Sequence, residues 1–86
     1  CILSASGIAD LGCYHPDAEV AAVKRAMIAQ AQCPILLLEH EKFERRALHR
    51  FADLTDFAHV VVDADISEQR REELLEAGVH LTVVGE

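Results

Sequence analysis

The stretch PILLLEHEKFERRALHR, residues 34–50, decides the fold of this chain. Its apolar run Ile35–Leu38 has no polar alternation, which is typical of a strand buried on both faces of a parallel sheet. The run changes to charged residues at Glu39. In open α/β sheets, ligands bind in the crevice outside the carboxyl ends of the strands. The residues that follow Leu38 are therefore the first place to look for a binding site.

Cations are concentrated just beyond this run, although the chain has a formal net charge of −7. Half of its eight lysines and arginines lie close together here: Lys42, Arg45, Arg46 and Arg50. Such a concentration at a strand end predicts a local site for an anion. A solvated basic loop is the alternative, because runs of charge usually mark exposed faces.

The first part of the chain predicts a strand, a turn, a loop and a helix. Residues 2–3 indicate a strand, and the small residues Ser-Ala-Ser-Gly at 4–7 indicate a tight turn. We interpret residues 8–15 as a loop. Pro16 and Asp17 open a helix, since proline is tolerated in the first turn and an acid there complements the helix dipole. Residues at helical spacing predict its buried face: Val20, Val23, Met27, Ile28 and Ala31.

The second part predicts two further strands and another helix. Residues 43–57 fit a short helix or a packed loop. The β-branched run at 59–62 is typical of a second buried strand and ends at Asp63. A helix is then expected to end at Gly78, and a last strand is expected at residues 81–84.

This alternation predicts the α/β class, with a parallel sheet and right-handed crossovers. We expect about four strands and two to three helices. No linker or low-complexity tract divides the chain, so residues 1–86 form a single unit. Parallel strands would bring three groups to one edge: the small residues at 4–7, Glu39 to Lys42, and Asp63 to Asp65. Carboxylates with a lysine can bind sugar hydroxyls and a phosphate, or act as the acid and base of an isomerase.

Three segments together resemble the effector domain of DeoR-type transcriptional repressors. They are VKRAMIAQA at 23–31, ILLLEHEKF at 35–43 and RRALHRFADLTDFAHVVVDA at 45–64. The resemblance covers nearly the whole chain. Members of that family typically have serine and glycine where this chain has Glu41 and Glu44. Both departures add negative charge beside Lys42.

The resemblance implies a three-layer, Rossmann-like fold similar to that of ribose-5-phosphate isomerase. Residues 1–86 are then the incomplete C-terminal part of an effector domain, and we expect a fragment because the chain starts at Cys1. The implied function is sensing of a phosphorylated sugar or a related metabolite, without catalysis. Effector binding would weaken operator binding by a separate N-terminal helix-turn-helix, which these residues do not contain.

The resemblance and the strand ends together give six expected effector-binding residues. We expect no catalytic residue, metal ligand or cofactor. His40 and Glu44 lie four apart, as some metal pairs do, but a surface histidine is the interpretation we prefer. The six expected effector-binding residues are Ser6, Gly7, Lys24, Glu39, Lys42 and Asp63.

Two other classes of function compete with sensing. An isomerase-like enzyme would use the strand-end carboxylates and Lys42. A receiver-type phosphoacceptor domain would use Asp63, but that fold needs an acidic pair after the first strand and a lysine after a late strand. This chain has Ser-Ala-Ser-Gly at the first place and no lysine after Lys42.

Composition and net charge limit the cellular compartments and the classes of partner that suit this chain. The net charge of −7 argues against a surface that grips nucleic acid, so DNA would be bound by another segment. Three cysteines without a C-x-x-C pair indicate a reducing, cytoplasmic setting, and Cys33 beside a buried strand is interpreted as a core residue. No apolar stretch is long enough to cross a membrane. We expect a homo-oligomer, because two main helices cannot cover both faces of four parallel strands.

Overall fold

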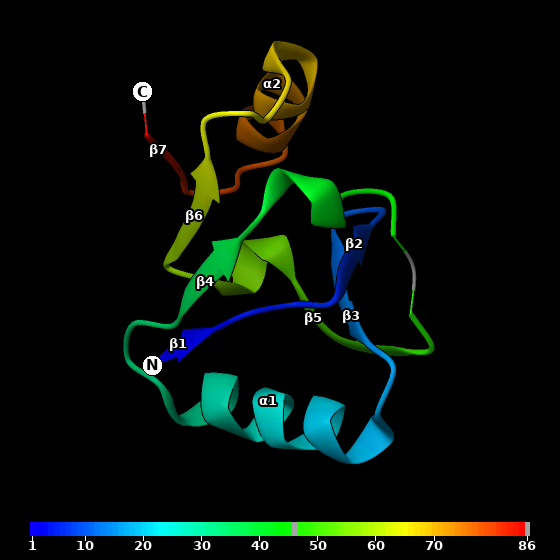
Figure 1. Cartoon of the computed structure of the whole chain (residues 1–86). Coiled ribbons are helices and arrows are strands. Elements are labelled where there is room, and N and C mark those ends of the chain that lie inside the picture. Colours follow the sequence, from blue (N-terminus) through cyan, green and yellow to red (C-terminus); the bar gives the residue numbers. More distant parts are fainter. Residues whose placement is uncertain (46, 86) are drawn as a thin grey trace.

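The computed structural model describes residues 1–45 and 47–85 (Figure 1). Arg46, one of the four clustered cations, lies outside the described residues, as does Glu86. Seven strands, two α-helices and two 3₁₀ turns are described. In chain order they are β1 (Ile2–Leu3), β2 (Gly7–Ala9), β3 (Gly12–His15), α1 (Ala18–Gln30), β4 (Ile35–Leu38), η1 (His40–Lys42), β5 (His49–Asp53), η2 (Leu54–Asp56), β6 (His59–Asp63), α2 (Glu68–Glu76) and β7 (Leu81–Val84).

A four-stranded parallel sheet forms the centre of the fold, in the order β1-β4-β6-β7. The two apolar runs that predicted strands are the two inner strands, and Leu38 lies opposite Val62 at their carboxyl ends. Leu36, Val60 and Val62 are almost fully buried on one face of the sheet. The expected α/β class with a parallel, Rossmann-like sheet is confirmed.

A second sheet was not expected. It is antiparallel, in the order β2-β3-β5. The interpretation of residues 8–15 as a loop is therefore wrong, because they form most of a hairpin. Its two-residue turn places Asp10 and Leu11 at positive φ, 48° and 64°. Hairpin turns of this kind usually contain Asn-Gly or Asp-Gly, and Asp-Leu gives no such signal.

Helix α1 begins where the sequence predicts, and α2 ends before Gly78 as expected. The Asp17 side chain caps α1 by accepting hydrogen bonds from the backbone N–H groups of Glu19 and Val20. Ser67 caps α2 in the same way, and Gly78 follows that helix with a φ of 86°. Figure 1 shows the helices at opposite ends of the molecule, with the sheets between them.

The expected buried face of α1 is wrong in part: Ile28 packs against the core, but two of the expected residues do not. Val23 and Met27 are 59% and 40% exposed, and Ala21 is the residue of this helix that is fully buried. The helix packs against β3 and β5 of the second sheet, which the sequence did not reveal. A small side chain at Ala21 suits this close approach.

One face of the parallel sheet keeps apolar side chains in contact with solvent. Ile2, Leu37 and Val84 are 64%, 48% and 48% exposed, and the strand register places them on the same face. We call this set, together with Ile35 and Val61, the open face. Within the described part of the chain no helix covers it. None of the described helices is long and apolar enough to cross a membrane.

Candidate functional site

A cleft of about 530 Å³ opens at the carboxyl ends of the parallel strands. Apolar side chains of the open face form part of its lining, including Leu37, Val61 and Val84. Residues of the β1–β2 connection, β3, α1, η1 and the end of β6 supply the polar lining. These polar residues are Ser4, Ser6, His15, Lys24, Glu39, Lys42 and Asp63.

Five of the six expected effector-binding residues line this cleft: Ser6, Lys24, Glu39, Lys42 and Asp63. They come from segments far apart in the sequence, and parallel pairing of β1, β4 and β6 brings them together. His15 joins them from β3 because the second sheet turns its end toward the cleft. Sequence reasoning missed His15, because it interprets residues 8–15 as a loop.

Gly7 is the one expected site residue that the structure places outside the cleft lining. It begins β2 and pairs with Tyr14 of β3. A Cβ atom at this position would overlap the carbonyl oxygen of Arg45. The absence of a side chain at Gly7 therefore serves close backbone packing.

Lys24 reaches the cleft from α1 and is held in place there. Its ammonium group donates a hydrogen bond to the carbonyl oxygen of Ser4, and Nζ lies 5.1 Å from the centroid of the Phe51 ring. Burial lowers the pKa of Lys24 from the ordinary 10.5, and this outweighs the opposite effect of Cys13. An ammonium group has three donors, so Lys24 can still donate to a ligand.

Lys42 reaches the cleft from η1, directly beyond β4. The backbone N–H of Lys42 donates to the carbonyl oxygen of Glu39 at 3.0 Å, which closes the turn after the strand. Among the described residues, Lys42 forms no ion pair. Its positive charge is therefore available to a bound anion.

Glu41 and Glu44, the two acidic departures from the DeoR pattern, have different surroundings in the structure. Glu44 forms an ion pair with Arg70, with 2.8 Å between Oε1 and Nη2, beside a separate cavity of about 250 Å³. Its charge is thus compensated away from the cleft. Glu44 has a φ of 66°, a left-handed conformation that glycine adopts without strain. Glu41 is an exposed residue of η1.

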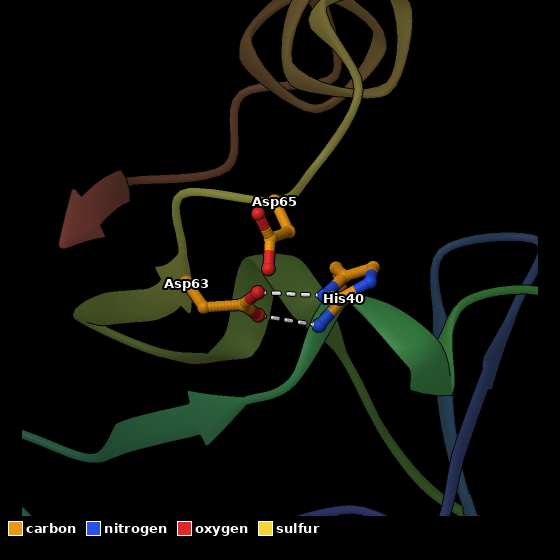
Figure 2. A group of neighbouring side chains, drawn as sticks. All are labelled: His40, Asp63 and Asp65. Carbon is orange, nitrogen blue, oxygen red and sulfur yellow. Dashed lines mark hydrogen bonds and ion pairs between the residues drawn. The ribbon is translucent and has the colours of Figure 1, made fainter. Parts of the chain in front are cut away.

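His40 and Asp63 form a close pair at the edge of the cleft (Figure 2). The backbone N–H of His40 donates to Oδ1 of Asp63 at 2.6 Å, and ring Nδ1 lies 2.6 Å from Oδ2. The ring hydrogen bond with Asp63 raises the pKa of His40 above 6.5, more than partial burial lowers it. The backbone hydrogen bond from His40 is the main cause that lowers the pKa of Asp63 below 3.8.

Asp65 completes this group. Ligand atoms of His40, Asp63 and Asp65 all lie within 4.8 Å of one another, which is close enough to share a metal ion. The sequence interpretation left His40 as a surface histidine. One sequence signal could have linked His40 to Asp63. His40 comes two residues after one buried strand, and Asp63 ends the neighbouring one.

A family model named DeoR C-terminal sensor domain matches residues 1–64. This chain belongs to the DeoR sensor-domain family. Searches of curated proteins and of solved structures found no match to the chain. The matched region runs from β1 to the residue after β6, and it contains every polar residue that lines the cleft. The resemblance inferred from residues 23–64 is confirmed.

Proposed function

We propose that this chain is the effector-sensing part of a DNA-binding transcriptional repressor of sugar metabolism, and that its cleft binds a phosphorylated sugar or a related metabolite. The observation that carries the proposal is the meeting of Lys24 and Lys42 with Glu39 and Asp63 around one cleft. Lysine ammonium groups suit a phosphate, and carboxylates accept hydrogen bonds from sugar hydroxyls.

The cleft also has features that suit the rest of a sugar. Ser6 adds a hydroxyl that can donate and accept hydrogen bonds. Leu37, Val61 and Val84 offer an apolar surface to the C–H groups of a sugar ring. Because Glu44 is paired with Arg70, its negative charge opposes a phosphate at Lys42 less than the sequence alone indicates.

The signal would pass to DNA through another segment of the regulator. This chain carries a net charge of −7, which disfavours contact with phosphate backbones. Effector binding then biases a conformational equilibrium that sets operator affinity. DeoR sensor domains are regulatory, so sensing is favoured over the isomerase-like alternative. A regulator of this kind would work in the cytoplasm, where three free cysteines are also stable.

Calorimetric titration of the chain with pentose and hexose phosphates tests the proposal. Inorganic phosphate and the unphosphorylated sugars serve as comparison ligands. Lys42→Ala should weaken sugar-phosphate binding by about 10- to 100-fold, since a hydrogen bond to a charged group contributes roughly 1.5–3 kcal/mol. Arg45→Ala is the matched control, because it removes an exposed cation outside the cleft. Equal affinities of the two variants would contradict the proposal.

We further propose that two copies of the chain pack through the part of the open face that lies outside the cleft, at Ile2 and Ile35. Parallel sheets normally have both faces covered, and a contiguous apolar surface marks an interface. Sedimentation equilibrium over a wide concentration range should reveal a dimer or a larger assembly. Ile2→Glu should weaken it, whereas Leu48→Glu should not, because Leu48 is 83% exposed and lies outside this face. A well-folded wild-type monomer at all concentrations would overturn this proposal.

A further inference from the structure

Three side chains of metal-binding type converge beside the cleft: His40, Asp63 and Asp65 (Figure 2). Among the described residues, they are the group whose ligand atoms all lie within 4.8 Å of one another. We propose that this group binds a divalent transition-metal ion. The proposal goes beyond effector sensing and does not depend on it.

The backbone places these ligands on firm supports. Leu38 and Val62 are paired, buried residues at the ends of neighbouring strands β4 and β6. His40 comes two residues after Leu38, and Asp63 is the last residue of β6. Ligands carried by the ends of packed strands need little rearrangement to bind an ion.

The distances suit an ion with short bonds. Metal–nitrogen and metal–oxygen bonds of about 2.0–2.2 Å place two ligands of one ion roughly 3–4 Å apart. Nδ1 of His40 and Oδ2 of Asp63 are now 2.6 Å apart, so a small opening admits an ion between them. The ion would replace the hydrogen bond between these atoms, and the displaced proton would pass to water. The imidazole then binds in its neutral form.

The lack of a competing cation among the described lysines and arginines, together with free space, supports the same conclusion. Neither Asp63 nor Asp65 forms an ion pair with a described lysine or arginine. A cavity of about 230 Å³, lined in part by His40 and Asp65, opens next to the group and has room for water ligands. Arg70 also lines this cavity, but it pairs with Glu44. Three protein ligands with open positions for water is a common arrangement for an accessible metal ion.

The ligand types select the class of ion. One imidazole nitrogen with two carboxylates suits Zn²⁺, Mn²⁺ and similar ions, whereas Ca²⁺ and Mg²⁺ prefer oxygen ligands alone. The side chains of His40 and Asp63 are 34% and 37% exposed, so an ion can reach them from solvent.

The test is a calorimetric titration of the metal-free chain with ZnCl₂, without any sugar phosphate. Cys1→Ser and Cys33→Ser are included in every variant, because exposed thiols also bind zinc. We expect one Zn²⁺ per chain, with Mg²⁺ and Ca²⁺ at least tenfold weaker. Asp65→Asn should weaken Zn²⁺ binding by tenfold or more, as should His40→Gln. Glu41→Gln is the control, because it removes a nearby charge but no ligand.

The position of the ion is read from amide NMR spectra with Mn²⁺ added. Paramagnetic broadening should centre on residues 39–41 and 63–67. Broadening centred on His15, His49, His59 or His80 would overturn the proposal. Unchanged Zn²⁺ affinity in Asp65→Asn would also overturn it, as would equal affinity for Ca²⁺. Because no sugar phosphate is present, these results are independent of whether the cleft binds an effector.

Discussion

Asp63 binds His40 through both of its carboxylate oxygens, one to the backbone N–H and one to the imidazole ring, each at 2.6 Å. The contact ties the end of β6 to the first residue of η1. It therefore fixes the turn that also carries Lys42 into the cleft. The same two residues thus connect the shape of the cleft that we propose to bind an effector with the group proposed to bind a metal ion.

We predict that this pair stabilises the metal-free fold most between about pH 4 and pH 6.5. The pKa of His40 is raised above 6.5 in the folded chain, so its contribution is complete below 6.5 and is lost as the pH rises through the raised value. The pKa of Asp63 is lowered below 3.8, so its contribution is complete above 3.8 and is lost as the pH falls through the lowered value.

Urea unfolding in the presence of a chelator measures this effect. The difference in free energy of unfolding between wild type and His40→Gln should be larger at pH 5.5 than at pH 8.5. His59→Gln is the control, because His59 is an exposed histidine without a carboxylate partner among the described residues. A difference that does not change with pH in His40→Gln would contradict the prediction.

Lys24 should lose its proton at a lower pH than an ordinary lysine. Burial in the cleft lowers the pKa of Lys24 from 10.5. The chain has two lysines, so ¹³C-methylated protein gives two lysine side-chain signals, and Lys42→Arg assigns them. The Lys24 signal should titrate below pH 10.5 and return to the ordinary range in urea. A titration at or above 10.5 in the folded chain would show that this ammonium group is not desolvated.

Gly7→Ala should destabilise the fold by about 1–3 kcal/mol, the usual range for an overpacked position. The added methyl group would overlap the carbonyl oxygen of Arg45, which belongs to the backbone and cannot turn aside. Gly12→Ala is the matched control in the same hairpin, where the nearest atom is Nε of the flexible Arg50 side chain at 2.7 Å. Urea unfolding should give the larger loss for Gly7→Ala; equal losses would contradict this explanation.

The sequence predicted the parallel sheet because both inner strands are uninterrupted apolar runs. The carboxyl ends of Ile35–Leu38 and of the run at 59–62 located the cleft. Glu39, Lys42 and Asp63 follow from this inference, whereas Lys24 was expected from the family resemblance. Strand pattern and topology together are therefore sufficient to locate the cleft, although not the contacts within it. The expected burial of these strands on both faces is wrong, because Leu37 on the open face is 48% exposed.

The second sheet could not be predicted from local pattern. Its hairpin turn at Asp10 and Leu11 lacks glycine, and the short strand β2 has no period of its own. The error extended to the core: Cys33 was expected there, but Cys33 is exposed and Cys13 of β3 is buried. Cys13 became a core residue because β3 lies between β2 and β5. That environment depends on long-range pairing, which periodicity does not reveal.

The buried position of Cys13 has a chemical consequence. Desolvation raises the pKa of Cys13 to about 12, so its reactive thiolate form is scarce near neutral pH. A colorimetric disulfide reagent at pH 8 should modify two thiols per folded chain, the exposed Cys1 and Cys33, and the third only after unfolding. Cys13→Ser should leave the number of reactive thiols in the folded chain at two. Rapid modification of three thiols in the wild-type fold would contradict the buried position.

Leu11→Gly should stabilise the chain by about 0.5–1 kcal/mol. Leu11 occupies the second position of the hairpin turn with a φ of 64°, and this left-handed conformation costs a residue with a Cβ roughly 1 kcal/mol that glycine avoids. The substitution also creates Asp-Gly, a preferred pair for a two-residue hairpin turn. Leu11 is 39% exposed, so only part of its side-chain burial is lost.

The matched control for this last substitution is Leu48→Gly. Leu48 is 83% exposed and does not have a positive φ, so glycine there relieves no strain and adds only freedom to the unfolded chain. Urea unfolding should show a higher midpoint for Leu11→Gly than for wild type, at an unchanged slope, and a midpoint no higher than wild type for Leu48→Gly. If Leu11→Gly were less stable than wild type, the leucine side chain would contribute more through its contacts beside Arg70 and Leu74 than its backbone conformation costs.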